Sequence, residues 1–196
     1  MKDYSKRQLE IIHASIELIG EGGIQEFTVK NLSRKIGFVE AALYRHFSSK
    51  SDILLAVFSF LEAKVLQRYN AIMHIECLPM DKLHETIKSY IEYFSENPAL
   101  VIVHLNDGIY KNEPALQKKI LSIMDDTKGH FERILNEGKE QGQIRQDLSS
   151  SDMAIMIMGM MRITVTRWSL QNYATNLNSL EESVFLFLQA IVKADN

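Results

Sequence analysis

The segment Thr28–Lys50, TVKNLSRKIGFVEAALYRHFSSK, decides the fold because it predicts two short helices separated by a turn at Gly37. Apolar residues at helical spacing form one inner face: Val29, Leu32 and Ile36 before the turn, and Leu43 and Phe47 after it. This arrangement is typical of a helix-turn-helix, in which the second helix presents its outer face to base edges in the major groove of DNA.

The same segment carries a local excess of positive charge. Its only acidic residue is Glu40, and its basic residues are Lys30, Arg34, Lys35, Arg45 and Lys50. The whole protein has a formal net charge of −3, so the excess of positive over negative charge in this segment is local. Localised charge favours docking on a duplex over indiscriminate coating of nucleic acid. A glycine-turned helix pair with a basic face also occurs as plain scaffold, so charge and spacing alone leave both interpretations open.

The outer face of the second predicted helix supplies candidate DNA contacts. Glu40 can accept from a cytosine amino group, Ala41 and Ala42 can touch a thymine methyl group, and Arg45 can bond guanine. Four further residues are candidate phosphate contacts: Thr28, Tyr44, His46 and Lys50. Lys30 belongs to the same predicted DNA-binding set. Taken singly, Tyr44 could be a packing residue and His46 a surface histidine, but their grouping with Lys50 favours phosphate roles.

At these residues the segment resembles the TetR family of bacterial transcription regulators. The resemblance covers about Gln8 to Leu55 and rests on positions in register: an alanine of the first helix, then Thr28, Gly37, Leu43, Tyr44, His46, Phe47 and Lys50. It implies a homodimer whose last two helices form a four-helix interface, with two recognition helices about one duplex turn apart on a palindromic site. It also implies that a ligand in the helical body tilts the helix after the head and changes that spacing.

Two positions depart from the family pattern. Val39 stands where the family usually has a small polar residue, and Ala41 stands where it often has glycine. A valine side chain cannot cap a helix, and loss of a cap costs about 1 kcal/mol. We therefore expect the recognition helix to depend on tertiary packing or on DNA for its order.

Helical periodicity continues through the rest of the chain, and no alternating β-branched run bounded by hairpin turns interrupts it. The sequence predicts an all-α protein with about nine helices. Cap pairs predict several helix starts: Ser5 with Gln8, Ser49 with Asp52, Ser149 with Asp152, and Asn178 with Glu181. Glycines predict helix ends at Gly22, Gly23, Gly108 and Gly142.

Short predicted helices precede residue 50 and long ones follow it. This change predicts a DNA-binding head at residues 1–50 and a ligand-binding and dimerisation body at residues 51–196. A helix from Ser49 to about Ile75 would be shared by both. The head carries eight Lys and Arg against six Asp and Glu, and this asymmetry suits an anion-binding head on an acidic body.

The predicted helix Asp152–Leu170 contains the run MAIMIMGMM, which is apolar on all sides, so both of its faces must be covered. A methionine-rich wall suits a pocket for a largely apolar ligand, although each residue taken singly is more simply core. The candidate pocket residues are Tyr90, Phe94, His104, Tyr110, Phe131, Met156, Met160 and Trp168. The candidate dimer-interface residues are Arg162, Arg167, Val184, Phe187, Leu188 and Ile191. The two arginines could instead meet an anionic ligand head group.

Patterns typical of enzymes are absent from the sequence. The six histidines have no zinc-protease spacing, and there is no glycine-rich phosphate loop and no nucleophile elbow. We therefore expect no catalytic residues, no metal and no cofactor. Cys77 is the only cysteine, which excludes an intramolecular disulfide and fits a reducing cytosol.

The start of the chain is too polar for a signal peptide, and its longest apolar run, Met153–Met161, is nine residues where a span needs roughly 20. The sequence thus predicts a cytoplasmic protein without a membrane partner. Its partners would be double-stranded DNA, a second copy of the chain and a small effector. The leading hypothesis is a ligand-responsive repressor, and the alternative is a helical small-molecule or partner-binding protein that has lost DNA binding. An all-α enzyme is a third and weaker hypothesis.

Overall fold

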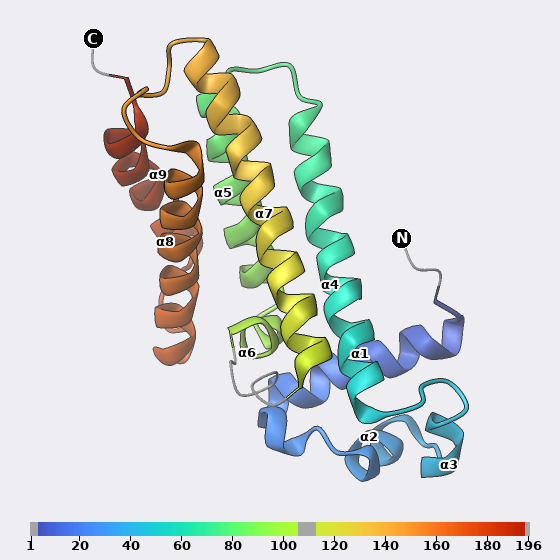
Figure 1. Cartoon of the computed structure of the whole chain (residues 1–196). Coiled ribbons are helices and arrows are strands. Elements are labelled where there is room, and N and C mark those ends of the chain that lie inside the picture. Colours follow the sequence, from blue (N-terminus) through green and yellow to red (C-terminus); the bar gives the residue numbers. More distant parts are fainter. Residues whose placement is uncertain (1–3, 106–112, 195–196) are drawn as a thin grey trace. The chain divides into compact units, whose positions relative to one another are not determined.

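The computed structural model describes residues 4–105 and 113–194, and the elements found there are helices joined by turns (Figure 1). The helices confirm the predicted all-α fold, and a 3-10 turn at Ile24–Glu26 follows the first of them. Their bounds are Lys6–Gly22 (α1), Val29–Ile36 (α2), Glu40–Leu43 (α3), Lys50–Met73 (α4), Pro79–Glu96 (α5), Ala99–Leu105 (α6), Pro114–Glu140 (α7), Ser150–Leu170 (α8) and Asn178–Val192 (α9). None of the described helices is long and apolar enough to cross a bilayer.

Local capping explains where several helices begin. Ser5 and Gln8 form a reciprocal capping box at α1, in which Ser5 Oγ accepts from Gln8 N at 3.3 Å and Ser5 N donates to Gln8 Oε1 at 3.0 Å. Serine hydroxyls also accept from the backbone N–H three residues on at the starts of α4 and α8: Ser49 from Asp52 at 3.0 Å, and Ser149 from Asp152 at 3.1 Å. These predicted helix starts are confirmed.

Other predicted boundaries need correction or stay outside the described residues. The N-cap of α9 is Leu177, which makes no side-chain cap, so the predicted Asn178–Glu181 cap is wrong. Glu181 Oε1 instead lies 2.5 Å from His84 Nε2 and links α9 to α5. Gly142 adopts a φ of 69° after the end of α7, as expected of a glycine stop, whereas Gly108 lies outside the described residues.

Contacts divide the chain into two compact units. The first comprises Met1–Lys64 and Pro98–Ile123, and the second comprises Val65–Asn97 and Met124–Asn196. They do not coincide with the predicted boundary at residue 50, because α4 and α7 each contribute to both units. A division by contacts is not a division by function, so the predicted domains 1–50 and 51–196 stay a prediction.

In the first unit, α1 packs against α2 and α6. The core residues Ile11, Ile12 and Ile19 of α1 are fully buried, as is Leu32 of α2. A small residue is required where α1 meets α6, because a Cβ atom built on Gly20 would lie 2.8 Å from Ala99 Cα and closer still to Ala99 Cβ. The packing of α1 therefore holds both the first helix of the helix-turn-helix and a segment far along the chain.

In the second unit, α5 packs against α8 and α9. The buried face of α5 carries Leu83, Ile87 and Ile91, which recur at helical spacing. Facing helices bury Phe131 from α7 and Val165 from α8 completely. The helical spacing of apolar residues therefore marks the buried face of α5.

Candidate DNA-binding surface and ligand cavity

The turn between α2 and α3 is built on Gly37. This residue caps α2 with a φ of 69°, in the left-handed region that favours glycine, and Phe38 N donates to Ser33 O at 2.8 Å across the turn. The inner sides of the two helices are buried, since Leu32 is 0% and Leu43 1% exposed. The predicted inner face therefore holds α2 and α3 against the core. The opposite side of α3 does not contact the core.

The outer side carries the predicted DNA-binding residues. Most of them are exposed: Thr28, Lys30, Glu40, Ala41, Tyr44, Arg45 and Lys50. Ala42 and His46 are half-buried. Tyr44 is a large aromatic residue that is 51% exposed, so its ring is not core packing in the described chain. The structure thus brings the whole predicted set to α2, α3, the turn after α3 and the start of α4.

Some of these residues also have structural contacts. Thr28 Oγ1 accepts from Asn31 N at 3.1 Å and caps α2. Lys50 Nζ lies 5.2 Å from the centroid of the Phe27 ring, a cation–π contact that fixes the direction of the lysine. The backbone carbonyl of His46 accepts from Gln8 Nε2 at 3.2 Å and leaves its imidazole available. These contacts fix side chains of the predicted DNA-binding surface. None of them pairs the Lys50 ammonium group with a carboxylate.

Lys35 behaves differently from the other basic residues of the segment. Its Nζ lies 2.9 Å from Glu21 and 3.3 Å from Glu17, both on α1. The hydrogen bond to Glu21 raises the pKa of Lys35. The positive charge counted at Lys35 in the sequence is therefore neutralised within the protein, and it contributes less to a DNA-docking surface than the count suggested.

The recognition helix is short and lacks a side-chain cap. Its N-cap residue, Val39, is 72% exposed and makes no capping hydrogen bond, as expected from the sequence. Beyond the four residues of α3 the chain continues as a turn, in which His46 N donates to Leu43 O at 2.9 Å and Phe47 N donates to the same oxygen at 3.1 Å. The buried Leu43 and Phe47 side chains hold this segment in place of a cap.

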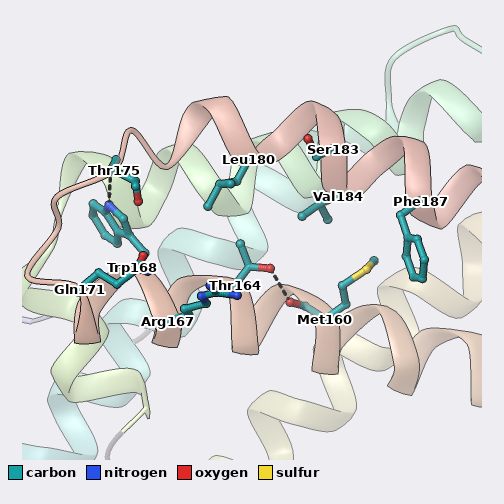
Figure 2. Close-up of a pocket in the computed structure, with 10 residues that line it drawn as sticks. All are labelled: Met160, Thr164, Arg167, Trp168, Gln171, Thr175, Leu180, Ser183, Val184 and Phe187. Carbon is teal, nitrogen blue, oxygen red and sulfur yellow. Dashed lines mark hydrogen bonds between the residues drawn. The ribbon is translucent and has the colours of Figure 1, made fainter.

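A cavity of about 540 Å³ lies between α8 and α9 in the second unit (Figure 2). Its lining is Met160, Thr164, Arg167, Trp168, Gln171, Thr175, Leu180, Ser183, Val184 and Phe187. Two hydrogen bonds fix polar groups of the wall: Trp168 Nε1 donates to Thr175 O at 2.7 Å, and Thr164 Oγ1 donates to Met160 O at 2.8 Å. The volume is within the range of small-molecule sites, and Arg167 is the charged side chain among the lining residues.

This cavity brings together residues that the sequence had assigned to two different roles. Met160 and Trp168 were predicted to line a ligand pocket, whereas Arg167, Val184 and Phe187 were predicted to contact a partner subunit. The sequence could not predict that residues of the two sets line one cavity, because their contact depends on how α8 packs against α9.

The remaining predicted pocket residues are dispersed. Tyr90 and Phe94 of α5 are in edge contact, with ring centroids 4.8 Å apart, and Phe131 of α7 is fully buried in the same unit. Met156 is 73% exposed on α8 and does not line the cavity. Tyr110 and the side chain of His104 lie outside the described residues. A pocket containing all eight residues stays a prediction.

The predicted dimer residues are divided between surface and core. Phe187 is 62% and Ile191 42% exposed, but Leu188 is only 2% exposed. Burial raises the pKa of Tyr90, and the nearby Arg162 opposes this rise, so Arg162 lies close to Tyr90 of α5. Five further exposed apolar residues on these two helices were not in the predicted dimer set: Ile155, Met156, Ile163, Leu170 and Leu186. The run MAIMIMGMM of α8, which is apolar on all sides, was the signal that could have found Ile155 and Met156. Exposed apolar patches of this kind are common at interaction sites, so the predicted dimer interface on α8 and α9 stays a prediction.

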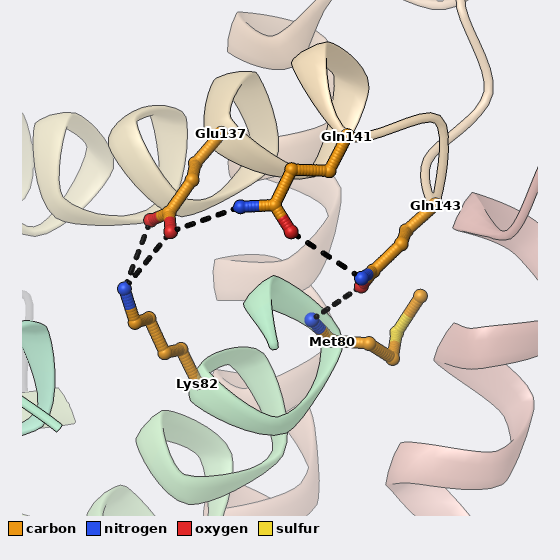
Figure 3. A network of polar contacts seen from close by, with 5 residues as sticks. All are labelled: Met80, Lys82, Glu137, Gln141 and Gln143. Carbon is orange, nitrogen blue, oxygen red and sulfur yellow. Dashed lines mark hydrogen bonds and ion pairs between the residues drawn. The ribbon is translucent and has the colours of Figure 1, made fainter. Parts of the chain in front are cut away.

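A polar network joins the start of α5 to the end of α7 and the turn that follows (Figure 3). Lys82 Nζ lies 3.0 Å from Glu137, and the lysine is 7% exposed. Gln141 Nε2 donates to Glu137 Oε1 at 3.4 Å, and Gln143 Oε1 accepts from Met80 N at 3.3 Å. The network ties the start of α5 to the contiguous segment that ends α7 and forms the following turn, more than 50 residues further along the chain.

Sequence reasoning missed a buried polar group in the second unit. His130 and Tyr69 are 0% and 2% exposed, and their rings stack with centroids 4.3 Å apart. Burial, with a smaller contribution from Arg133, lowers the pKa of His130 to about 4. Neither residue belongs to a recognisable motif, so no signal in the sequence could have found the pair. Within the described part of the chain, no group of His, Cys, Asp and Glu is placed to hold a metal ion.

Comparison with known proteins accounts for nearly the whole chain. The family model for bacterial regulatory proteins of the tetR family matches residues 11–57, and the model for the C-terminal region of YsiA-like proteins matches residues 45–191. The fatty acid metabolism regulator protein of Bacillus subtilis is 26% identical over 188 residues, which are 96% of each chain. The nucleoid occlusion factor SlmA of Haemophilus influenzae is 27% identical over 135 residues, covering 68% of this chain and 62% of SlmA.

A solved structure extends this similarity to the fold. The transcriptional regulator FadR from Bacillus subtilis, in complex with stearoyl-CoA, superposes with a TM-score of 0.85 at 25% identity, covering 93% of this chain and 97% of FadR. The helix-turn-helix on the basic segment and the helical remainder both fall within the matched models. This protein therefore belongs to the TetR family of bacterial transcriptional regulators and is not an enzyme.

Proposed function

We propose that this regulator is a cytoplasmic homodimeric repressor that binds a palindromic operator and releases it when a largely apolar ligand binds the second unit. The observation that carries the proposal is the helix-turn-helix, whose Leu32 and Leu43 are buried while Tyr44 and Arg45 are exposed beside it. A buried inner face and a polar outer face are what docking of α3 in the major groove requires.

The exposed residues divide by the contacts that their chemistry allows. Arg45 suits a guanine edge, and Glu40 suits a cytosine amino group. Tyr44 and Lys50 suit phosphates, which position the head without reading sequence. Replacing Lys50 should therefore weaken binding to all duplexes, whereas replacing Arg45 should also relax the sequence preference.

The ligand part of the proposal draws on the similarity to a regulator whose solved structure contains stearoyl-CoA. An acyl chain is a largely apolar guest, and the second unit contains aromatic side chains at Tyr90, Phe94 and Phe131, of which the two phenylalanines are buried. For a hundredfold loss of operator affinity, the ligand must favour the non-binding conformation by only about 2.7 kcal/mol. We therefore take long-chain acyl-CoA as the first probe.

The dimer part of the proposal draws on the exposed apolar side chains of α8 and α9. Met156, Ile163 and Phe187 are each more than half exposed, which is costly for three large apolar residues on neighbouring helices of a monomer. A second copy packed on this face would bury them and close the cavity between α8 and α9. The change Phe187→Glu should then lower the fraction of dimer in sedimentation measurements, while Lys118→Ala, at an exposed position on α7, should not.

The test of the whole proposal is selection of bound duplexes from a random pool, followed by titration of the selected duplex with and without stearoyl-CoA. We expect an enriched palindrome, loss of binding in Tyr44→Ala and Lys50→Ala, and weaker binding when stearoyl-CoA is present. Lys118→Ala is the matched control, because it removes one exposed lysine outside the helix-turn-helix. Equal affinity with and without the acyl-CoA would refute this effector class. No enriched sequence would favour the alternative, a helical binding protein that has lost DNA recognition.

A further inference from the structure

Val39 presents an exposed apolar side chain at the start of the recognition helix. The residue is 72% exposed and stands directly before Glu40, the first residue of α3. Among the described residues up to Lys50, the exposed large apolar or aromatic side chains are Val39 and Tyr44. They are the N-cap and C-cap residues of α3. Single exposed apolar residues are ordinary on a protein surface, but these two bracket the one helix that reads DNA.

The backbone on both sides of Val39 is held in place. Before it, Phe38 N donates to Ser33 O at 2.8 Å, and Arg7 Cζ lies 5.4 Å from the centroid of the Phe38 ring. After it, Ala42 N donates to Val39 O at 2.8 Å. The valine side chain is branched at Cβ, which restricts its χ1 angle. The two γ-methyl groups are therefore held in a narrow range of positions on the surface.

Neither packing nor capping accounts for a valine at this position. The side chain is too exposed to belong to the core, and it makes no capping hydrogen bond. A serine at the same place would add a cap and stabilise α3, so the valine gives up that stability. What the valine supplies instead is an apolar surface at the N-terminal end of the recognition helix. In a helix-turn-helix, residues at this end contact base edges.

The chemistry of valine selects among the bases. Its side chain has no hydrogen-bond donor or acceptor, so it cannot bond the polar groups that line the major groove. The apolar group presented there is the C5 methyl group of thymine. We propose that Val39 is a specificity-determining residue, which contacts a thymine methyl group in each half-site of the operator. This inference rests on the proposed docking of α3 in the major groove and adds one base preference to it.

The experiment replaces thymine by deoxyuridine in the duplex selected from a random pool, at one symmetric pair of positions at a time. Deoxyuridine lacks the C5 methyl group and keeps the hydrogen-bonding groups of thymine, so only the apolar contact is removed. Fluorescence anisotropy titration of each duplex with the full chain, at one salt concentration, measures the affinities. We expect one pair at which the parent loses about fifteenfold in affinity, or about fourfold per half-site, as the loss of one buried carbon group in each predicts.

Two variants separate the methyl contact from the order of the helix. Val39→Ser and Val39→Ala both remove the γ-methyl groups, but only serine can cap α3. In both variants the deoxyuridine penalty at that pair should fall below about twofold. Leu121→Ala, which truncates a 60% exposed apolar residue of α7, is the matched control and should keep the full penalty. The Val39 side chain is exposed, so both variants should fold, and Val39→Ser should melt no lower than the parent.

The outcomes separate this inference from the proposed repressor. A selected operator in which no thymine shows a methyl penalty would overturn the role of Val39 and leave the repressor standing. A penalty that survives in either variant would do the same. Survival in Val39→Ala alone would assign the effect to the missing cap rather than to the methyl contact. Failure to select any operator would overturn both the inference and the proposed function.

Discussion

The close approach of α1 and α6 predicts that Gly20→Ala destabilises the protein. An added Cβ would lie 2.8 Å from Ala99 Cα, whereas carbon atoms pack best at about 3.5–4.0 Å. The nearest atoms are the Cα and Cβ of Ala99, so relief requires movement of a helix backbone and not rotation of a side chain. Overpacking of this kind costs about 1–3 kcal/mol.

A gain in helix propensity opposes this cost. Alanine is favoured over glycine inside a helix by at most about 1 kcal/mol, and Gly20 lies in the last turn of α1, where the gain is smaller. We therefore expect a net loss of about 1–2 kcal/mol in the free energy of unfolding. Urea unfolding at fixed protein concentration measures this loss, and an unchanged slope would show that the denatured state is unaffected.

Gly129→Ala in α7 is the matched control. A Cβ atom there meets nothing within 4 Å, so the same substitution should stabilise the protein by about 0.5–1 kcal/mol. Gly159 is equally open in the single chain, but it lies on the α8 surface that a second subunit is proposed to cover. If Gly20→Ala proves as stable as Gly129→Ala, the inference that α1 and α6 tolerate only glycine at this contact is wrong.

Three further predictions concern the second unit. Lys82→Met leaves the partly buried Glu137 carboxylate without its cation and should cost about 1–3 kcal/mol by urea unfolding; a neutral result would show that the pair contributes nothing. The pKa of His130 is about 4 in the folded protein and near 6.5 in the unfolded chain. Between these pH values the unfolded state binds more protons than the folded state. The free energy of unfolding should therefore fall by up to about 3 kcal/mol as the pH drops from 6.5 to 4. His130→Phe should flatten that pH dependence, and an identical profile in parent and variant would contradict the assignment. Ser149→Ala removes the cap of α8 and should lower the free energy of unfolding by about 1 kcal/mol, which thermal or urea unfolding can detect.

Features that depend on neighbours in sequence were predictable. The capping box at Ser5, the glycine turn at Gly37 and the missing side-chain cap at Val39 all stand as the sequence predicted them. The reason is that a cap or a turn is decided within three or four residues of backbone. The predicted cap at the start of α9 failed: the helix begins after Leu177 without a side-chain cap, and Glu181 meets His84 of another helix.

The candidate sites were predictable only in part. The outer face of the helix-turn-helix followed from helical spacing once Leu43 was placed inside. The pocket and the dimer surface did not, because an apolar residue on α8 satisfies either role equally well in sequence. The cavity that joins Trp168 with Phe187 exists only through the packing of α8 on α9.

The sequence by itself determined that this protein is helical and carries a helix-turn-helix at Thr28–Lys50, because periodicity, caps and the glycine turn are local properties of the chain. Tertiary structure alone decided which polar groups of different helices meet. It turned Lys35 toward Glu21 of α1, and it stacked Tyr69 on His130, 61 residues further along the chain. Contacts between such distant residues are selected by the packing of whole helices, and no local pattern in the sequence encodes them.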